Sequence, residues 1–241
     1  MTSALFWITR PAEDSAAVLA AMQRLQLSAL DHPVMRMEHT QVTITESYDH
    51  LIITSKHACH ALNGMLRNQP IWCVGSALAE RLTSMGFMNL HLYPKASALL
   101  QDFTRNVKPP ARILYLRGEI VRLDIADILR AQHYVADHTI CYRSIGLLDM
   151  SPELRRALES RAPLICLFYA MQAARFTHAL LGRHGYAPEV ARIHGICMSA
   201  PIAEEAQRYG FRHVVTAAKA DNAHMLESAL AQQAMHVKLT P

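Results

Sequence analysis

Short, wholly apolar runs alternate along this chain with longer stretches in which apolar residues recur at helical spacing. Uninterrupted apolar runs predict strands that are buried on both faces, whereas the longer pattern predicts amphipathic helices. The alternation favours an α/β fold with parallel sheets and right-handed crossovers. Strands are expected at Ala4–Thr9, Leu51–Ile53, Ile71–Val74, Arg112–Leu116, Leu164–Phe168 and Ala191–Met198. Helices are expected at Asp14–Leu27, from Ser55, and at Ser76–Met85, Arg122–Gln132, Pro152–Ser160, Ala170–Leu181, Ala200–Tyr209 and Met225–Gln232.

Two distant parts of the chain, residues 71–87 and 195–211, share one pattern. Each has an apolar strand, a turn of small or hydroxyl residues, an alanine-rich helix and a Gly-Phe exit. The two copies keep one constant offset, and a shorter match relates residues 6–10 to 114–118. A duplicated unit suggests two similar lobes with a cleft between them, and such clefts are favoured places for ligands.

Composition and charge limit the classes of function. About half of the 241 residues are apolar, which is enough to bury a core in one large domain or two small ones. The formal net charge of +4 is spread along the chain, so it does not indicate nucleic-acid binding but would help to attract an acidic small molecule. Five cysteines without paired spacing predict reduced, buried thiols and favour the cytoplasm. The N-terminus lacks the basic region of a signal peptide, and the longest apolar run, Ala162–Met171, is too short to span a bilayer.

Several common ligand motifs are missing. The sequence has nine glycines and no G-x-G-x-x-G after a strand, no P-loop and no G-x-S-x-G elbow, which argues against a Rossmann-type dinucleotide site. His57 and His60 flank Cys59 at the start of an expected helix, but the usual metal sites need more ligands at matched spacings. We interpret these residues as an exposed histidine pair beside a buried cysteine.

Hydroxyls, small residues and arginines follow the expected strands. In open α/β sheets, ligands bind beyond the carboxyl ends of the strands, where helix N-termini offer free N–H groups to carboxylates or phosphates. Each serine or threonine, taken singly, is better explained as a helix cap that stabilises by about 1 kcal/mol. Several such ends facing one cleft would instead form a site for a large polyanion. These strand-end residues are Thr9-Arg10, Thr54-Ser55, Gly75-Ser76, Arg117-Gly118 and Ser199.

Taken together, these segments resemble the uroporphyrinogen-III synthase family, whose members close the tetrapyrrole ring in haem biosynthesis. The resemblance covers almost the whole chain and rests on the order and spacing of the motifs, since no single one is specific. The segments that carry it are Ile8-Thr9-Arg10-Pro11, Leu51-Ile52-Ile53-Thr54-Ser55, Cys73-Val74-Gly75-Ser76-Ala77, Ile113-Leu114-Tyr115-Leu116-Arg117-Gly118-Glu119 with Arg122 and Asp124, Cys141-Tyr142-Arg143, and Ile196-Cys197-Met198-Ser199.

The resemblance implies two flavodoxin-like parallel-sheet lobes joined by a two-stranded linker, with a cleft between them. One lobe is expected to comprise residues 1–36 plus 147–241, and the other residues 37–146. Two partly polar, extended segments, Pro33–Thr45 and His138–Ile145, fit the two crossings.

The sequence departs from the family pattern at three places. The family has a Thr-Ser-Pro (T-S-P) motif at the position of Thr54-Ser55-Lys56, so Lys56 stands where proline is usual. Leu78 replaces the threonine that usually follows Gly75. The second T-S-P is largely lost, since Phe168-Tyr169-Ala170-Met171 stand at its place, where Tyr169 keeps a hydroxyl at the usual serine but reaches further. These departures concern the substrate contacts and leave the expected fold unchanged.

The resemblance also implies an activity, that of a cyclising hydro-lyase. Such an enzyme converts hydroxymethylbilane to uroporphyrinogen III with inversion of ring D and loss of water, and uses neither a metal nor an organic cofactor. Tyr142 matches the family's functional tyrosine and would donate a proton or a hydrogen bond to the leaving hydroxyl; the simpler alternative is a tyrosine packed on a linker strand with its hydroxyl in water. The expected substrate contacts are Arg10, Thr54, Ser55, Gly75, Ser76, Arg117, Gly118, Tyr169 and Ser199.

Two other functions stay open at this point. A non-catalytic bilobal relative that binds a tetrapyrrole or another polycarboxylate is favoured by the altered second T-S-P, whereas Tyr142 favours catalysis. A flavodoxin-like nucleotide-binding protein would need a phosphate loop that the sequence lacks. We expect a monomer that acts on a small molecule, with no nucleic-acid or membrane partner and at most a transient contact with hydroxymethylbilane synthase.

Overall fold

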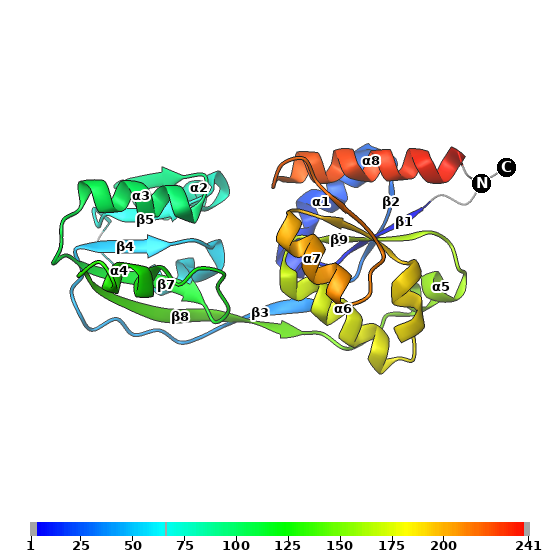
Figure 1. The fold of residues 1–241 in the computed structure, drawn as a ribbon, viewed down its shortest axis with the longest axis horizontal. Helices are drawn as coiled ribbons and strands as arrows, with labels where there is room; N and C mark the ends of the chain where they lie inside the picture. The colour runs from blue at the N-terminus through cyan, green and yellow to red at the C-terminus, as the bar shows by residue number, and fades with distance from the viewer. Residues whose placement is uncertain (1–3, 66, 239–241) are drawn as a thin grey trace. The chain divides into compact units, whose positions relative to one another are not determined.

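The computed structural model describes residues 4–65 and 67–238 (Figure 1). The chain divides into two compact units, a first unit of residues 1–36 with 145–241 and a second unit of residues 37–144. Each unit is built on its own sheet with helices, so the expected α/β class is confirmed. The chain passes from the first unit into the second within β3 (Met35–His39) and returns within β8 (Val135–Gly146).

The sheet of the first unit has five strands in the order β11-β10-β9-β1-β2, and all neighbours run parallel. Parallel neighbours require a crossover between strands, which the helices provide. The strands are β1 (Leu5–Ile8), β2 (Ser28–Asp31), β9 (Leu164–Phe168), β10 (His194–Cys197) and β11 (His213–Thr216). The helices are α1 (Ala12–Arg24), α5 (Pro152–Glu159), α6 (Met171–Arg183), α7 (Ala200–Arg208), α8 (Asn222–Lys238) and the 3-10 helix η2 (Ala187–Arg192).

The sheet of the second unit has the order β3-β8-β7-β4-β5-β6. Successive side chains of β4 point to opposite faces, so Leu51 and Ile53 pack with η1 and α2 whereas Ile52 packs with α3 and α4. Because both faces are covered, the central strands are apolar at consecutive positions. The remaining elements are β4 (His50–Ile53), η1 (Lys56–Leu62), β5 (Ile71–Val74), α2 (Ser76–Ser84), β6 (Leu90–Tyr93), α3 (Ala96–Asn106), β7 (Arg112–Gly118) and α4 (Ile125–Arg130).

The internal sequence match corresponds to equal places in the two sheets. The first unit has the strand order β2-β1-β9-β10-β11, and the second has β8-β7-β4-β5-β6 with β3 added outside β8. The matched segments form the second strand of each series (β1 and β7) and the fourth (β10 and β5). Helices α2 and α7 each contain nine residues, and each is followed by a positive-φ glycine, Gly86 at +87° and Gly210 at +92°, and by a buried phenylalanine.

The glycine after α7 is required by its backbone conformation. A Cβ on Gly210 would meet Val190 Cγ1 at 3.6 Å, an ordinary contact, so crowding does not explain the residue. Gly210→Ala is therefore expected to lower the free energy of unfolding by about 1–2 kcal/mol, measured by chemical denaturation. Gly182→Ala is the control, because a Cβ there meets nothing within 4 Å and the site is helical; we expect a gain of up to about 1 kcal/mol. Equal stabilities for the two variants would contradict this account.

The structure corrects several expected elements. The segment after Ser55 is a 3-10 helix, and the helix expected over Arg122–Gln132 spans only Ile125–Arg130. Asp124 begins that shorter helix, because its side chain accepts the N–H groups of Ala126 and Asp127. Elements that the sequence analysis did not predict are β2, β6, β11, α3 and η2. In the part of the chain that the structure describes, none of the helices combines the length and the apolar character needed to cross a bilayer.

Candidate active site

The strand-end residues gather at the carboxyl edge of each sheet. Neighbouring parallel strands end at the same edge, so each unit brings its own set together. In the second unit, the adjacent strands β7, β4 and β5 lead to Arg117-Gly118, Thr54-Ser55 and Gly75-Ser76. In the first unit, the adjacent strands β1, β9 and β10 lead to Thr9-Arg10, Tyr169 and Ser199.

Tyr142 owes its orientation to an irregularity in β8. Arg117 of β7 pairs with Ile140 of β8, but Gly118 pairs with Tyr142, so Cys141 is an extra residue in the ladder. Consecutive residues of a regular strand point to opposite faces. Here the β-bulge lets both Cys141 and Tyr142 pack against one core cluster, the one that includes η1 and α2.

The phenol ring of Tyr142 lies directly over Gly118. A Cβ on Gly118 would lie 2.7 Å from Cζ and 2.9 Å from the hydroxyl oxygen of Tyr142, closer than real Cβ atoms approach. Glycine is therefore the residue that allows the ring to lie against the backbone. The amide of Glu119 donates to the carbonyl of Tyr142 at 2.9 Å and holds the two strands together beyond the bulge.

Ser55 and His57 flank the phenol of Tyr142. The Ser55 side chain is hydrogen-bonded to the phenol, and its oxygen accepts the amide N–H of His57 at 3.3 Å as the N-cap of η1. The ring centroids of His57 and Tyr142 are 5.5 Å apart. Burial raises the pKa of Tyr142, and the hydrogen bond with Ser55 acts in the opposite direction.

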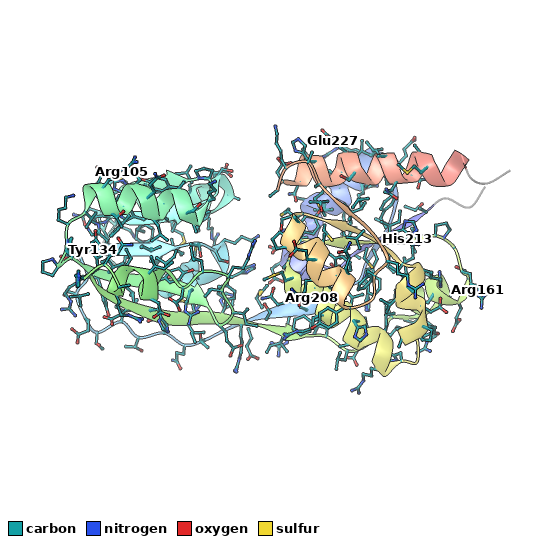
Figure 2. All side chains as sticks on the ribbon, viewed as in Figure 1. Arg105, Tyr134, Arg161, Arg208, His213 and Glu227 are labelled. Atoms are coloured by element: carbon teal, nitrogen blue, oxygen red, sulfur yellow. The ribbon has the colours of Figure 1, made fainter. Side chains whose placement is uncertain are left out.

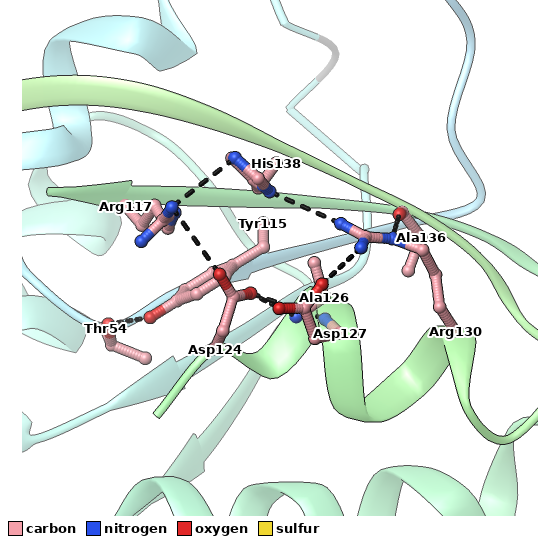
Figure 3. Close-up of polar contacts among 9 residues, drawn as sticks. All are labelled: Thr54, Tyr115, Arg117, Asp124, Ala126, Asp127, Arg130, Ala136 and His138. Atoms are coloured by element: carbon pink, nitrogen blue, oxygen red, sulfur yellow. Dashed lines mark hydrogen bonds and ion pairs between the residues drawn. The ribbon is translucent and has the colours of Figure 1, made fainter. Parts of the chain in front are cut away.

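Arg117 is fixed at the end of β7 instead of being solvated. Its side chain is 12% exposed, and its Nη2 lies 3.5 Å from Asp124 Oδ2 and 3.4 Å from His138 Nε2 (Figure 3). Asp124 is itself held in place, since it caps α4. The Nε of Arg117 is buried and finds no hydrogen-bond partner among the described residues. A guanidinium that is held at a strand end is suited to a carboxylate.

The residues that follow β4 and β5 in the second unit differ in their hydrogen bonds. Thr54 Oγ1 and the hydroxyl of Tyr115 are hydrogen-bonded at 3.1 Å, and burial raises the pKa of Tyr115. Gly75, at φ +91°, precedes α2, and its amide donates to the carbonyl of Tyr93 at 2.9 Å. Ser76 is the exposed first residue of α2, which has no side-chain cap. The first-turn N–H groups of α2 are thus left for water or an anion.

The first unit carries a second cluster around Arg10. The guanidinium carbon of Arg10 lies 4.2 Å from the centre of the Tyr169 ring, and Nη1 donates to Asn222 Oδ1 at 3.3 Å. Its Nη2 lies 3.8 Å from Asp14 Oδ2. Burial raises the pKa of Tyr169, and the charge of Arg10 opposes the shift. The hydroxyl of Tyr169 is buried and has no partner in hydrogen-bond geometry within the described ranges.

Aligning the ends of β4 and β9 changes which residues of the first unit correspond to the T-S-P motif. Ser55 follows the end of β4 by two residues and caps η1; Ala170 follows the end of β9 by two residues and is the N-cap of α6, without a side-chain bond. Ala170 therefore takes the place of the serine, and Tyr169 takes the place of Thr54. The expectation that Tyr169 stands where serine is usual is wrong by one position.

Capping explains only part of the strand-end hydroxyls. Ser55 caps η1 as expected, but Ser199 precedes α7 without a side-chain cap bond. Thr9 donates instead to the carbonyl of Leu167 at 2.6 Å and ties β1 to β9. Thr9, Thr54, Ser76 and Ser199 are thus strand-end hydroxyls that make no helix-cap bond in the structure.

The histidines of η1 do not form a metal centre. Among the described residues, no group of three or more histidine, cysteine or acidic side chains could hold a metal ion. His57 and His60 are half-buried, so their expected exposure is wrong; His60 contacts the carbonyl oxygens of His57 and Thr40 with its two ring nitrogens, both at 3.1 Å. Cys59 is buried as expected.

The five cysteines are free and buried, which confirms the expectation. Burial raises the pKa of Cys73 and Cys141 to about 11, and that of Cys197 to about 12. The thiolate is the nucleophile and metal ligand, so these thiols are inert at neutral pH.

Three residues that contact the predicted site residues were not predicted from the sequence. Asp124 ion-pairs with Arg117, His57 flanks Tyr142, and Asn222 binds Arg10. The role of Asp124 could have been predicted from the sequence, because Asp124 ends the motif by which this segment resembles the family. The role of Asn222 could not have been predicted, because Asn222 lies 212 positions from Arg10 along the chain.

Comparison with solved structures agrees with the fold described above. Uroporphyrinogen-III synthetase from Helicobacter pylori is 18% identical, with a TM-score of 0.66 over 95% of this chain and 99% of that one. A mutant uroporphyrinogen III synthase from the extremely thermophilic bacterium Thermus thermophilus is 16% identical, with a TM-score of 0.56 over 97% of this chain and 99% of that one. At these identities the likeness concerns the fold alone.

The sequence was also compared with curated proteins and with protein families. No curated protein matches the sequence. The family described as uroporphyrinogen-III synthase HemD matches residues 16–227. Because this match spans most of the chain, the protein belongs to the uroporphyrinogen-III synthase family.

Proposed function

We propose that this chain is a uroporphyrinogen-III synthase, a cyclising hydro-lyase that converts hydroxymethylbilane to uroporphyrinogen III with inversion of ring D. Membership of the family over residues 16–227 supports the reaction. Tyr142 is the observation that links the proposal to a particular site, because its half-buried ring lies on Gly118 and its phenol interacts with Ser55.

Tyr142 would act as the acid that assists departure of the substrate hydroxyl. The C–O bond of the hydroxymethyl group breaks, and the phenol proton leaves with that oxygen as water. The resulting azafulvene is attacked by the substituted carbon of ring D, and the spiro intermediate rearranges. The proton released as the last pyrrole becomes aromatic again returns to the phenolate. A raised pKa supports this role, because the phenol carries its proton at neutral pH.

The polycarboxylate character of the substrate gives the other strand ends a role. Arg10 and Arg117 would bind carboxylates, as would the open N–H groups at the start of α2 beside Gly75 and Ser76. The further proposed contacts are Thr54, Ser55, Gly118, Tyr169 and Ser199. Left alone, hydroxymethylbilane closes without inversion to the type I isomer, so the protein must hold it in a conformation that favours the other ring carbon.

Other properties follow from the same proposal. The two compact units would be the two lobes, with boundaries near residues 36 and 146. The reaction would need no metal or organic cofactor, as the family resemblance implies. We further propose a cytoplasmic monomer whose only required partner is its substrate, with at most a transient contact with hydroxymethylbilane synthase.

A second candidate is a non-catalytic relative that binds a tetrapyrrole or another polycarboxylate. The specific observation in its favour is the second T-S-P, where Ala170 provides no capping hydroxyl and the Tyr169 hydroxyl is buried. Such a protein would bind without steering ring closure.

The test is the isomer of the product. Hydroxymethylbilane is generated enzymatically in the presence of the protein, and the products are oxidised and separated as porphyrin isomers. A shift from type I to type III is expected. Type I alone, from a protein that is folded by circular dichroism, would overturn the proposal and favour the non-catalytic relative.

A further inference from the structure

A second hollow lies at the amino edge of the first-unit sheet, at the opposite ends of the strands from Arg10, Tyr169 and Ser199. It measures about 330 Å³, near the lower limit for small-molecule pockets. Its polar lining comes from His194, Arg212, His213 and Gln232. None of the candidate active-site residues lines it.

Two imidazole rings form one wall of this hollow. His194 begins β10 and His213 begins β11, and the two residues are direct register partners. Partners in a parallel pair project from the same face, which explains why the rings stack, with centroids 4.7 Å apart and planes 24° apart. Figure 2 labels His213 on the first unit.

Arg212 adds a permanent positive charge next to this wall. It is exposed, and within the described ranges it has no hydrogen-bond or ion-pair partner. Arg208 of the same unit differs, since its Nη1 lies 3.2 Å from Glu205 Oε2. The lining of the hollow contains no acidic side chain. An unpaired guanidinium beside two imidazoles, with no carboxylate to neutralise it, favours an anionic ligand.

We propose that this hollow binds a small multivalent oxyanion, either phosphate or a di- or tricarboxylate. Arg212 supplies the charge, the imidazole of His213 donates from the wall, and the carboxamide of Gln232 donates from α8. Strand β11 is an edge strand with one neighbour, β10. An anion held by β10, β11 and α8 would therefore fasten this edge of the sheet, and the proposal stands independently of the enzyme activity.

The test uses the full chain, titrated separately with inorganic phosphate and with citrate at constant ionic strength. Binding is followed through the histidine ring signals in NMR spectra, and His213→Gln identifies the signal of that ring. We expect saturable shifts of two histidine signals and affinity at least about tenfold weaker in Arg212→Gln, because a charge-assisted bond is lost. Arg208→Gln, which removes a charge that is already paired, is the matched control and should bind like the parent.

Each outcome decides the proposal. Saturation by phosphate, by citrate or by both supports it and identifies the oxyanion class. Shifts that do not saturate, or affinities that are equal in Arg212→Gln and the parent, would overturn it. Saturable binding that survives both Arg212→Gln and His213→Gln would assign the anion to another part of the chain and would overturn it as well.

Discussion

Tyr142→Phe is expected to slow the formation of uroporphyrinogen III by about 10²–10⁴-fold, the usual contribution of a positioned acid. The substitution removes the donating hydroxyl and keeps the ring that lies on Gly118, so the protein should fold normally. The measurement is the initial rate of type III formation at saturating hydroxymethylbilane. Because spontaneous closure continues while the variant is slow, its product should shift toward type I.

The control for this variant is Tyr48→Phe in the same unit. It removes an exposed hydroxyl that donates to Asp137 Oδ2 at 3.1 Å, and its rate should stay within about twofold of the parent. A parent-like rate for Tyr142→Phe would remove Tyr142 from the mechanism. The pH dependence offers a second check: since burial raises the pKa of Tyr142, loss of the acid form should begin only above the ordinary phenol range near about 10.

Gly118→Ala is expected to reduce the rate nearly as much as Tyr142→Phe, although it changes no reacting group. A Cβ at this position would lie 2.7 Å from Cζ of Tyr142, so the ring must leave the position that it occupies over Gly118. Overpacking of this kind also costs about 1–3 kcal/mol in the free energy of unfolding. The measurements are the rate of type III formation and the denaturation midpoint.

The double variant separates positioning from simple damage. If Gly118 acts through Tyr142, then Gly118→Ala combined with Tyr142→Phe should be about as slow as Tyr142→Phe alone. Gly182→Ala, which adds a Cβ in open space within α6, should keep the parent rate. Rate losses that multiply in the double variant would show that Gly118 contributes independently of Tyr142.

The strands with both faces covered could be predicted closely from the sequence. Ile71–Val74 and Leu164–Phe168 are observed with the bounds that were expected, because burial on both faces leaves an uninterrupted apolar run. The strands that were missed include the edges of the sheets, β2, β6 and β11, which are short and partly exposed. Helix α3 was missed because Lys95 at its N-cap gives no capping signal.

The candidate site could be predicted as a set of residues but not as a geometry. Parallel strands end at one edge, which is why Arg117, Ser55 and Gly75 could be grouped from the sequence. The direction of Tyr142 could not, because it depends on a β-bulge whose extra residue, Cys141, carries no signal in the sequence. The partner of Arg10 could not be predicted either, because Asn222 begins α8 and lies 212 positions away along the chain.

The most direct test of the central claim is the number of type III molecules formed per molecule of protein. Hydroxymethylbilane is supplied continuously by its synthase, in large excess over this chain, and the porphyrin isomers are quantified after oxidation. A synthase should form many molecules of type III for each protein molecule, in proportion to time and protein concentration. Type III that never exceeds one molecule per protein, or type I alone, would contradict the account and leave a tetrapyrrole-binding relative in its place.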